Sequence, residues 1–101
     1  MSHGDTTVRV SCEATSAGWR CSVDANDGAT TGRHEVTVAR EDAERLAVAR
    51  DDAAVVRLVE ETFDFLLDRE PRSSILATFD LTVVSRYFPE FEAEISARLA
   101  P

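Results

Sequence analysis

Alternating apolar and polar residues mark three segments in the first part of the chain. Apolar side chains occupy every second position of 8–12, 19–23 and 34–38, where His34 takes the first place of the third segment. This period of two is typical of strands with one buried face. The connections are rich in Gly, Ser, Thr, Asn and Asp, which favour turns. The pattern predicts a three-stranded antiparallel meander over 7–39, whose second face is polar and in contact with water.

After residue 39 the apolar residues recur at the three- and four-residue spacing of amphipathic helices. This spacing predicts a short helix over 41–49 and a longer helix over 52–70. The longer helix is expected to start after Asp51 as its capping residue and to end before Pro71. Its length is enough to cross one face of the sheet. The predicted fold is therefore α+β, with the helices packed on one sheet face.

Shorter helical segments are predicted in the last third of the chain. Ser73 or Ser74 is expected to cap a turn that carries Phe79, and Asp80 is expected to cap the next turn. Pro89 is expected at the first position of a final helix, because proline is preorganised for that position.

Length and composition fit one globular domain over 1–101. The apolar share of 44% and the charged share of 30% are close to ordinary globular averages. We expect a flexible tail over 1–6, the sheet over 7–39 and the helices over 41–99. No apolar run approaches the roughly 18 residues that cross a bilayer, and the N-terminus lacks the features of a signal peptide. The sequence thus predicts a cytoplasmic protein with no membrane partner.

The net charge of the chain indicates which kinds of partner it can bind. The formal net charge is −8 at pH 7. Binding to nucleic acid depends largely on basic side chains that neutralise phosphates, so the acidic balance makes nucleic acid an unlikely partner. A basic or neutral partner is expected instead.

The two cysteines are the first candidates for chemistry. Cys12 and Cys21 lie opposite each other if the hairpin loop is centred between Ala14 and Trp19, so a cross-strand disulfide is geometrically possible. In a reducing cytoplasm, however, inward-facing cysteines are more often small apolar core residues, and we expect free thiols. With His34 on the same face they supply at most three zinc ligands, fewer than a closed structural site needs.

Other candidate sites are weak. The loop 24–28 with Glu35 superficially matches a calcium loop, but its glycine comes one position early and strands flank it, so a turn is the better interpretation. Paired carboxylates lie on the polar sides of the predicted helices. A catalytic site would need a deep pocket that holds His34 and one of the cysteines. The sequence therefore predicts no catalytic residue, metal or cofactor, and no enzyme.

Six of the seven aromatic residues lie between Phe63 and Phe91, which predicts the packing centre of the protein. Within 86–91, however, Phe91, Tyr87 and Phe88 cannot all point the same way from a helix. At least one ring is then expected near the surface, and these three residues form a candidate protein interface. The alternative is that all three wrap around one core at a helix corner.

Three arginines carry a second functional hypothesis. Arg9, Arg20 and Arg33 fall on the polar face of the predicted sheet, where they would form a nucleic-acid contact of an antitoxin-like or RNA-binding-like module. The net charge opposes this alternative. The preferred prediction is a small non-enzymatic protein-interaction or regulatory module, whose partner is another protein or a second copy of the chain.

The C-terminal part of the chain also resembles a group of short bacterial proteins with no assigned activity. The resemblance rests on FLL-x-REP over 65–71, IL at 75–76, FDL at 79–81 and YFPE at 87–90, with a tryptophan-containing hairpin ahead of them. It covers most of 19–95. The resemblance implies a single module of constant length, and it implies no substrate, cofactor or site.

Overall fold

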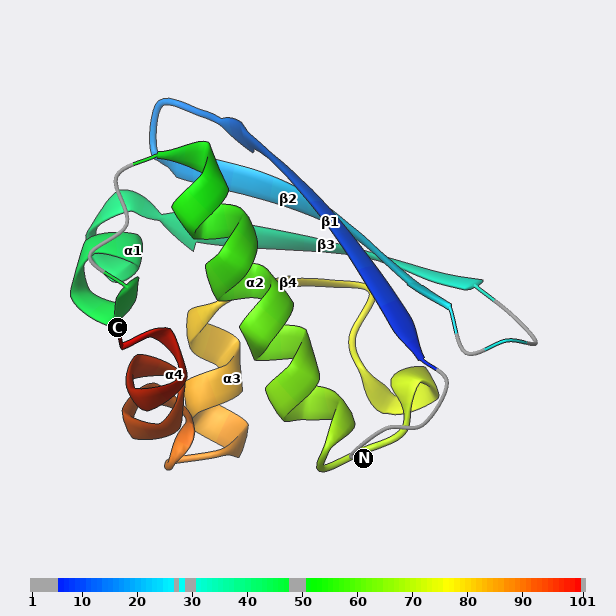
Figure 1. Ribbon diagram of the computed structural model, residues 1–101. Helices are drawn as coiled ribbons and strands as arrows, with labels where there is room; N and C mark the ends of the chain where they lie inside the picture. The colour runs from blue at the N-terminus through cyan, green and yellow to red at the C-terminus, as the bar shows by residue number, and fades with distance from the viewer. Residues whose placement is uncertain (1–5, 27, 29–30, 48–50, 101) are drawn as a thin grey trace.

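A computed structural model describes residues 6–26, 28, 31–47 and 51–100 of the chain (Figure 1). The elements follow one another in the order β1 (Thr7–Ala14), β2 (Gly18–Asn26), β3 (Thr31–Ala39), α1 (Arg40–Ala47), α2 (Asp52–Leu67), the short 3-10 helix η1 (Arg72–Ser74), β4 (Thr78–Asp80), α3 (Thr82–Tyr87) and α4 (Phe91–Leu99). The α+β prediction is confirmed.

The strands form one mixed sheet in the order β1-β2-β3-β4. β1 pairs antiparallel with β2 in an unbroken register from Thr7 opposite Asn26 to Ala14 opposite Trp19, and β2 pairs antiparallel with β3. The meander predicted over 7–39 is therefore confirmed. Its inner face is apolar and its outer face carries the exposed polar residues, as the alternation requires.

The sheet departs from the prediction at β4, which adds a fourth strand parallel to β3. The Glu35 N–H donates to the Ala77 carbonyl at 2.7 Å, and the Leu81 N–H donates to the Thr37 carbonyl at 2.9 Å. The expected sheet of only three antiparallel strands is thus incomplete, and the helical turn expected to carry Phe79 is wrong. A strand of three residues is too short to show a period of two, so tertiary pairing decides its structure.

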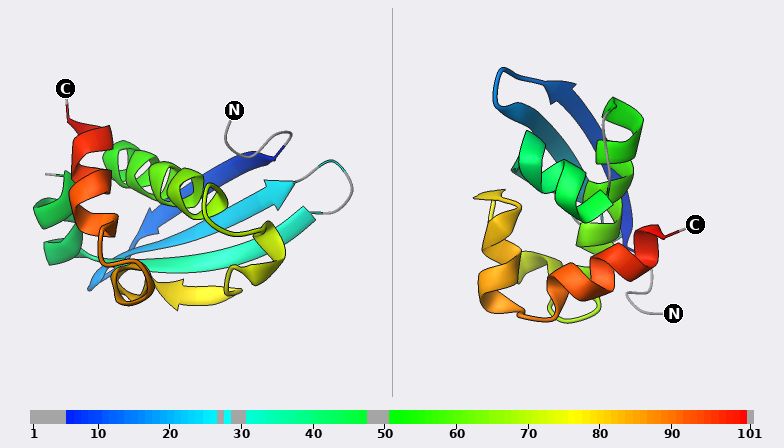
Figure 2. Two further views of the ribbon diagram at one scale, coloured as in Figure 1. Left: turned by 90° about the horizontal axis from the view of Figure 1, so that it is seen from below. Right: turned by 90° about the vertical axis from the view of Figure 1, so that its left-hand side faces the viewer.

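The helices gather on one side of the sheet (Figures 1 and 2). α2 packs against β1 and β2, and α1 packs against β2 and β3. α4 lies against α1 and α2, while α3 lies between β4 and α4. The expected coverage of one sheet face by the long helix is confirmed, and the outer face of the sheet stays open.

The core forms on two sides of α2. Phe63 and Phe65 are both fully buried, although they are two positions apart and point in different directions. The Phe63 ring lies 6.1 Å from the ring of Phe79 on the sheet, whereas the Phe65 ring lies 5.1 Å from that of Phe91 on α4. The aromatic part of the chain is therefore the packing centre, and α2 is held between the sheet and the C-terminal helices.

The start of α2 follows its predicted capping signal, and α1 starts within one residue of its predicted start. The Asp51 carboxylate accepts the backbone N–H of Ala54 at 2.9 Å, so the predicted cap of α2 is confirmed. α2 ends at Leu67, before Pro71 as expected but three residues before the predicted end at 70. α1 begins at Arg40, one residue before the predicted start, and its predicted end at 48–49 lies outside the described residues.

The later caps are only partly as predicted. Ser73 and Ser74 lie inside η1 and do not cap it. Pro89 stands two residues before α4, so its expected place at the first helical position is wrong. Asp80 does serve the start of α3, because its carboxylate accepts the Thr82 N–H at 3.1 Å and the Thr82 hydroxyl at 2.6 Å.

Cys12 and Cys21 form a disulfide between β1 and β2. They are direct partners in the register, with their Cα atoms 4.0 Å apart, and Cys21 is fully buried. The expectation of free thiols is therefore wrong. It rested on an assumed compartment, whereas the hairpin register already places the two side chains together. The same bond occupies both sulfur atoms that were considered as zinc ligands with His34.

Gly18 occupies a position in the hairpin with no room for a side chain. Its φ is +156°, and a Cβ atom there would overlap the Val38 carbonyl oxygen and approach the Arg40 nitrogen to 2.8 Å.

We expect Gly18→Ala to lower the free energy of unfolding by about 2 kcal/mol or more, since backbone atoms must move. Gly28→Ala is the matched control, because Gly28 also has a positive φ of +92° but open space around it. It should cost only about 1 kcal/mol. Equal losses in urea denaturation would contradict the steric explanation.

Candidate functional site

An apolar groove of about 380 Å³ lies beside the C-terminal end of α2. Its walls come from α2, the segment that joins η1 to β4, and α3. The residues that line it are Leu66, Glu70, Ser74, Ile75, Leu76, Phe79, Val83, Val84, Tyr87 and Phe88. The volume falls within the roughly 300–1,000 Å³ that is usual for ligand sites.

Two exposed hydrophobic side chains stand on this groove. Tyr87 is 69% exposed and Leu76 is 50% exposed, and they are the exposed large hydrophobic residues of the described part of the chain. Both line the same groove although 11 positions separate them in the sequence. Single exposed apolar residues need no explanation, but a shared apolar patch around a groove is typical of an interaction site.

The three aromatic residues proposed as an interface have different surroundings. Tyr87 is exposed, Phe88 is half-buried with its ring edge-on to that of Phe65 at 5.7 Å, and Phe91 is fully buried. Phe91 therefore belongs to the core and offers no surface to a partner, which corrects that part of the candidate interface. Leu76 takes its place on the groove. Leu76 directly follows buried Ile75, whose backbone is extended, and this arrangement was not predicted from the sequence, which indicated a helical turn there.

Buried His34 holds the Leu76 side of the groove in place. Its Nδ1 lies 2.7 Å from the Leu76 carbonyl oxygen. A carbonyl only accepts, so Nδ1 donates this hydrogen bond. The imidazole also packs against the Phe63 ring at 5.3 Å between ring centres. His34 is thus a structural anchor between β3 and the groove wall, and it does not line the groove itself.

Asp80 anchors the other end of the segment that begins at Leu76 and includes β4. Its carboxylate accepts the Thr37 hydroxyl at 2.9 Å, in addition to the two groups of Thr82. Burial favours the neutral acid, but the hydrogen bonds from Thr82 and Thr37 outweigh it and hold the pKa of Asp80 below its usual value. Asp80 is therefore ionised at neutral pH, and it links β3, β4 and the first turn of α3.

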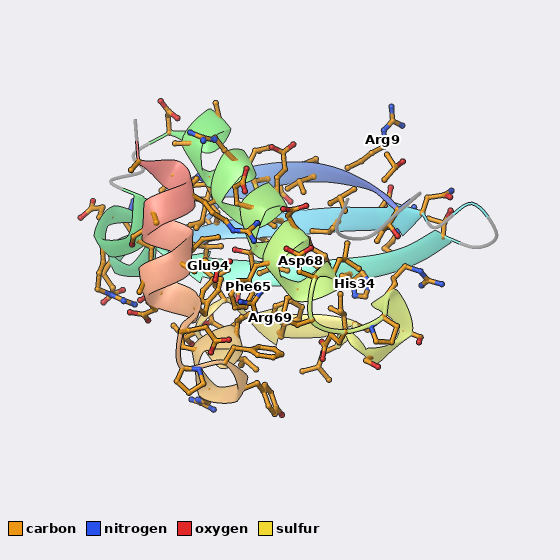
Figure 3. The ribbon with its side chains drawn as sticks, turned by 60° about the horizontal axis from the view of Figure 1, so that its bottom comes forward. Arg9, His34, Phe65, Asp68, Arg69 and Glu94 are labelled. Atoms are coloured by element: carbon orange, nitrogen blue, oxygen red, sulfur yellow. A yellow bond between two sulfur atoms is a disulfide. The ribbon has the colours of Figure 1, made fainter. Side chains whose placement is uncertain are left out.

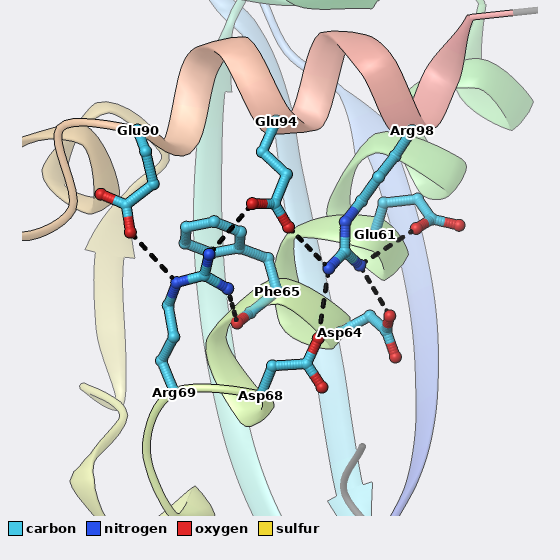
Figure 4. Close-up of polar contacts among 8 residues, drawn as sticks. All are labelled: Glu61, Asp64, Phe65, Asp68, Arg69, Glu90, Glu94 and Arg98. Carbon is cyan, nitrogen blue, oxygen red and sulfur yellow. Dashed lines mark hydrogen bonds and ion pairs between the residues drawn. The ribbon is translucent and has the colours of Figure 1, made fainter. Parts of the chain in front are cut away.

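Arg98 joins α4 to the C-terminal half of α2 (Figure 4). Its guanidinium lies 2.7 Å from Asp64, 3.2 Å from Asp68, 3.0 Å from Glu94 and 3.6 Å from Glu61. Burial opposes its charge, yet the hydrogen bonds to Glu94, Asp64 and Asp68 raise the pKa of Arg98. In turn, the hydrogen bond from Arg98 lowers the pKa of Glu94. One cation thus holds four carboxylates together.

Arg69 extends this network toward the groove. Its guanidinium carbon lies 3.6 Å from the centre of the Phe65 ring, and the guanidinium pairs with Glu90 at 3.2 Å and Glu94 at 3.0 Å. Figure 3 shows Arg69 and Glu94 beside Phe65, between α2 and α4. The stacked and paired arginine covers the core at Phe65 and fixes the end of α2 that forms one groove wall.

The three arginines of the alternative hypothesis share the outer face of the sheet but alternate with carboxylates. Arg9, Asp24 and Arg33 form one row across the strands, and Arg33 pairs with Asp24 at 3.1 Å. Arg20 lies two rows away, directly opposite Glu13. The structure therefore places all three on one face without joining them into a continuous basic surface.

Among the described residues, the polar side chains that line the groove are those of Glu70, Ser74 and Tyr87. Glu70 and Ser74 line it, whereas His34 and the disulfide-bonded cysteines do not. In the same part of the chain, no group of three or more His, Cys, Asp or Glu side chains is placed to hold a metal ion. The described helices are also too short or too polar to cross a membrane.

Comparisons with protein-family models, curated proteins and solved structures find no match for this chain. The resemblance to short bacterial proteins therefore stays a prediction. The functional inference rests on the groove and on the surfaces around it.

The network around Arg98 should make the free energy of unfolding depend on pH. We expect Arg98→Met to lower the free energy of unfolding by about 1–2 kcal/mol at pH 7, because four carboxylates lose their shared cation. The pKa of Glu94 is lowered in the folded state, so its contribution is present above the unfolded value of about 4.3 and is lost as pH falls through the folded value. The difference between wild type and variant should therefore shrink below pH ~4.

Arg33→Met is the matched control for this prediction. Arg33 makes one ion pair, with Asp24, and its side chain is 81% exposed. Its replacement should change stability by less than about 0.5 kcal/mol at either pH. Urea denaturation at pH 7 and at pH ~3 measures both variants. A loss for Arg98→Met that is the same at both values would show that the carboxylates do not carry the effect.

Proposed function

We propose that this protein is a small non-enzymatic protein-interaction module, which binds a basic or neutral segment of another protein through the apolar groove. The observation that carries the proposal is the position of Leu76 and Tyr87. These two exposed hydrophobic side chains come from different elements and stand on the same groove.

The groove suits apolar side chains of a partner. Its lining is apolar apart from Glu70, Ser74 and the Tyr87 hydroxyl, and half-buried Phe88 and Val83 continue the apolar surface into it. Interface centres are typically apolar and rich in aromatic residues, with few charges. Aromatic Tyr87 on the rim adds a large contact area at low conformational cost.

Charge supports a basic or neutral partner. Glu70 is the charged residue among those that line the groove, and the whole chain carries a formal net charge of −8. A positively charged segment would be attracted over a distance and would find a carboxylate at the groove. The favoured occupant is therefore a protein segment that combines apolar side chains with Lys or Arg.

Binding is favoured over catalysis because the described residues that line the groove include no His or Cys. Nucleic-acid binding is supported less well than protein binding. The candidate residues Arg9, Arg20 and Arg33 alternate with Asp24 and Glu13 on the sheet, which reduces the positive potential that phosphates require.

A random peptide library displayed on phage tests the proposal, with the purified wild-type protein as the target. We expect selection of peptides that combine aromatic or aliphatic residues with Lys or Arg. Tyr87→Ser should weaken their binding about tenfold or more, because the rim loses its largest apolar contact. Glu70→Gln should weaken the basic peptides selectively. Calorimetric titration of the synthesised peptides measures each affinity.

Arg20→Ser is the control, because it also removes a large exposed side chain but from the outer face of the sheet. It should leave peptide affinity unchanged. Tyr87→Ser should unfold at the same temperature as wild type, since that side chain is 69% exposed. Peptides that bind the Tyr87 variant as tightly as wild type, or a selection that yields no apolar basic peptides, would contradict the proposed function.

A further inference from the structure

Among the residues that the structure describes, β1 is a free edge of the sheet. Their strand order is β1-β2-β3-β4, so β1 pairs on one side only, over the whole of Thr7–Ala14. Natural proteins commonly protect such an edge with a proline, a bulge, a very short strand or charged side chains, and β1 carries one charge of each sign, Arg9 and Glu13. β1 has eight residues, no proline and an unbroken register with β2. Its backbone is therefore ready to pair with another strand.

The register shows which backbone groups face outward from this edge. Cys12 and Cys21 are opposite each other with Cα atoms 4.0 Å apart, which is typical of a non-hydrogen-bonded pair. The N–H and C=O groups of Cys12 therefore point away from β2, and the alternation extends this to Val8 and Val10. These same residues have half-buried side chains on the inner face.

The charged residues of β1 fit one partner, a second copy of β1, in one antiparallel register. On the outer face Arg9 and Glu13 flank Ser11 at equal distances along the strand. If a second β1 runs antiparallel about a two-fold axis at Ser11, each Arg9 faces Glu13 of the second copy and Ser11 faces Ser11 of the second copy. An axis at Val10 would instead place Arg9 opposite Ser11 of the second copy and would form neither ion pair.

We propose that two copies of this chain pair β1 to β1, antiparallel and centred on Ser11, to form a continuous eight-stranded sheet. Backbone hydrogen bonds at Val10 and Cys12, two Arg9–Glu13 ion pairs and further burial of Val8 hold the dimer together. Arg9 extends from this edge away from the helices (Figure 3). The groove lies beside β4 at the opposite edge, so both grooves of the dimer stay open.

Ser11→Cys tests the register directly. Facing residues of a non-hydrogen-bonded pair have Cα atoms about 4.5 Å apart, a distance that permits a disulfide. We expect this variant to form covalent dimers linked through position 11 under mild oxidation, as shown by peptide mass mapping. Ser22→Cys is the control, because Ser22 lies on the same exposed face directly opposite Ser11 but on β2, away from the edge. It should stay monomeric on a non-reducing gel.

Charge exchange tests the ion pairs. Sedimentation equilibrium of the full chain should show a concentration-dependent dimer. Arg9→Glu and Glu13→Arg should each raise the dimer Kd about tenfold or more, because like charges then face each other twice. The double variant should return the Kd to within about threefold of wild type. Thermal unfolding of each variant at low concentration should show that the monomer fold persists.

A mass of one chain up to ~1 mM would overturn the proposal. So would a dimer in which Ser11→Cys cross-links no better than Ser22→Cys, since its interface would lie elsewhere. A double charge variant that stays dissociated while its monomer is folded would overturn the register centred on Ser11.

Discussion

The pairing of β4 with β3 determines where the second half of the molecule lies. β4 has only three residues, but the residues on either side of it extend the pairing, because Glu35 donates to the Ala77 carbonyl and Leu81 donates to the Thr37 carbonyl. His34 and Thr37 add side-chain bonds from the same strand. Because these bonds connect the segment from Leu76 to Leu81 to β3, they fix the path of the chain between α2 and α3. The groove exists because that path runs beside the end of α2.

α2 connects the two halves of the structure. One side of it packs on the sheet through Phe63, and another packs on α4 through Phe65. A helix buried on two sides gains most of its stability from tertiary contacts. Arg98 then ties α4 to the same end of α2 through carboxylates on both helices. The result is a wall packed on both sides, beside which Tyr87 remains exposed.

Long periodic segments could be predicted from the sequence, whereas short and non-local features could not. The three meander strands and α2 each repeat a local pattern several times, and Asp51 is a local cap. β4 has three residues and a parallel partner 43 positions away, as in Glu35 opposite Thr78, so no local signal exists. The sequence predicted that at least one ring of Tyr87, Phe88 and Phe91 lies near the surface, and Tyr87 does. The burial of Phe91 and the exposure of Leu76 depend instead on how α4 and β4 pack. The hairpin register showed that a Cys12–Cys21 disulfide was geometrically possible. Free thiols were predicted instead because a reducing compartment was assumed.

Native-state hydrogen exchange, followed by NMR, tests most directly whether β4 holds a preformed groove. The Glu35 and Leu81 amides donate the hydrogen bonds at the two ends of the β3–β4 pairing, and their exchange can be compared with that of amides bonded between β2 and β3. If the pairing is part of the folded structure, both should exchange within about tenfold of the β2–β3 amides. Exchange of both at the rate of unprotected loop amides, with the β2–β3 amides still protected, would show that the groove wall is not formed in the free protein.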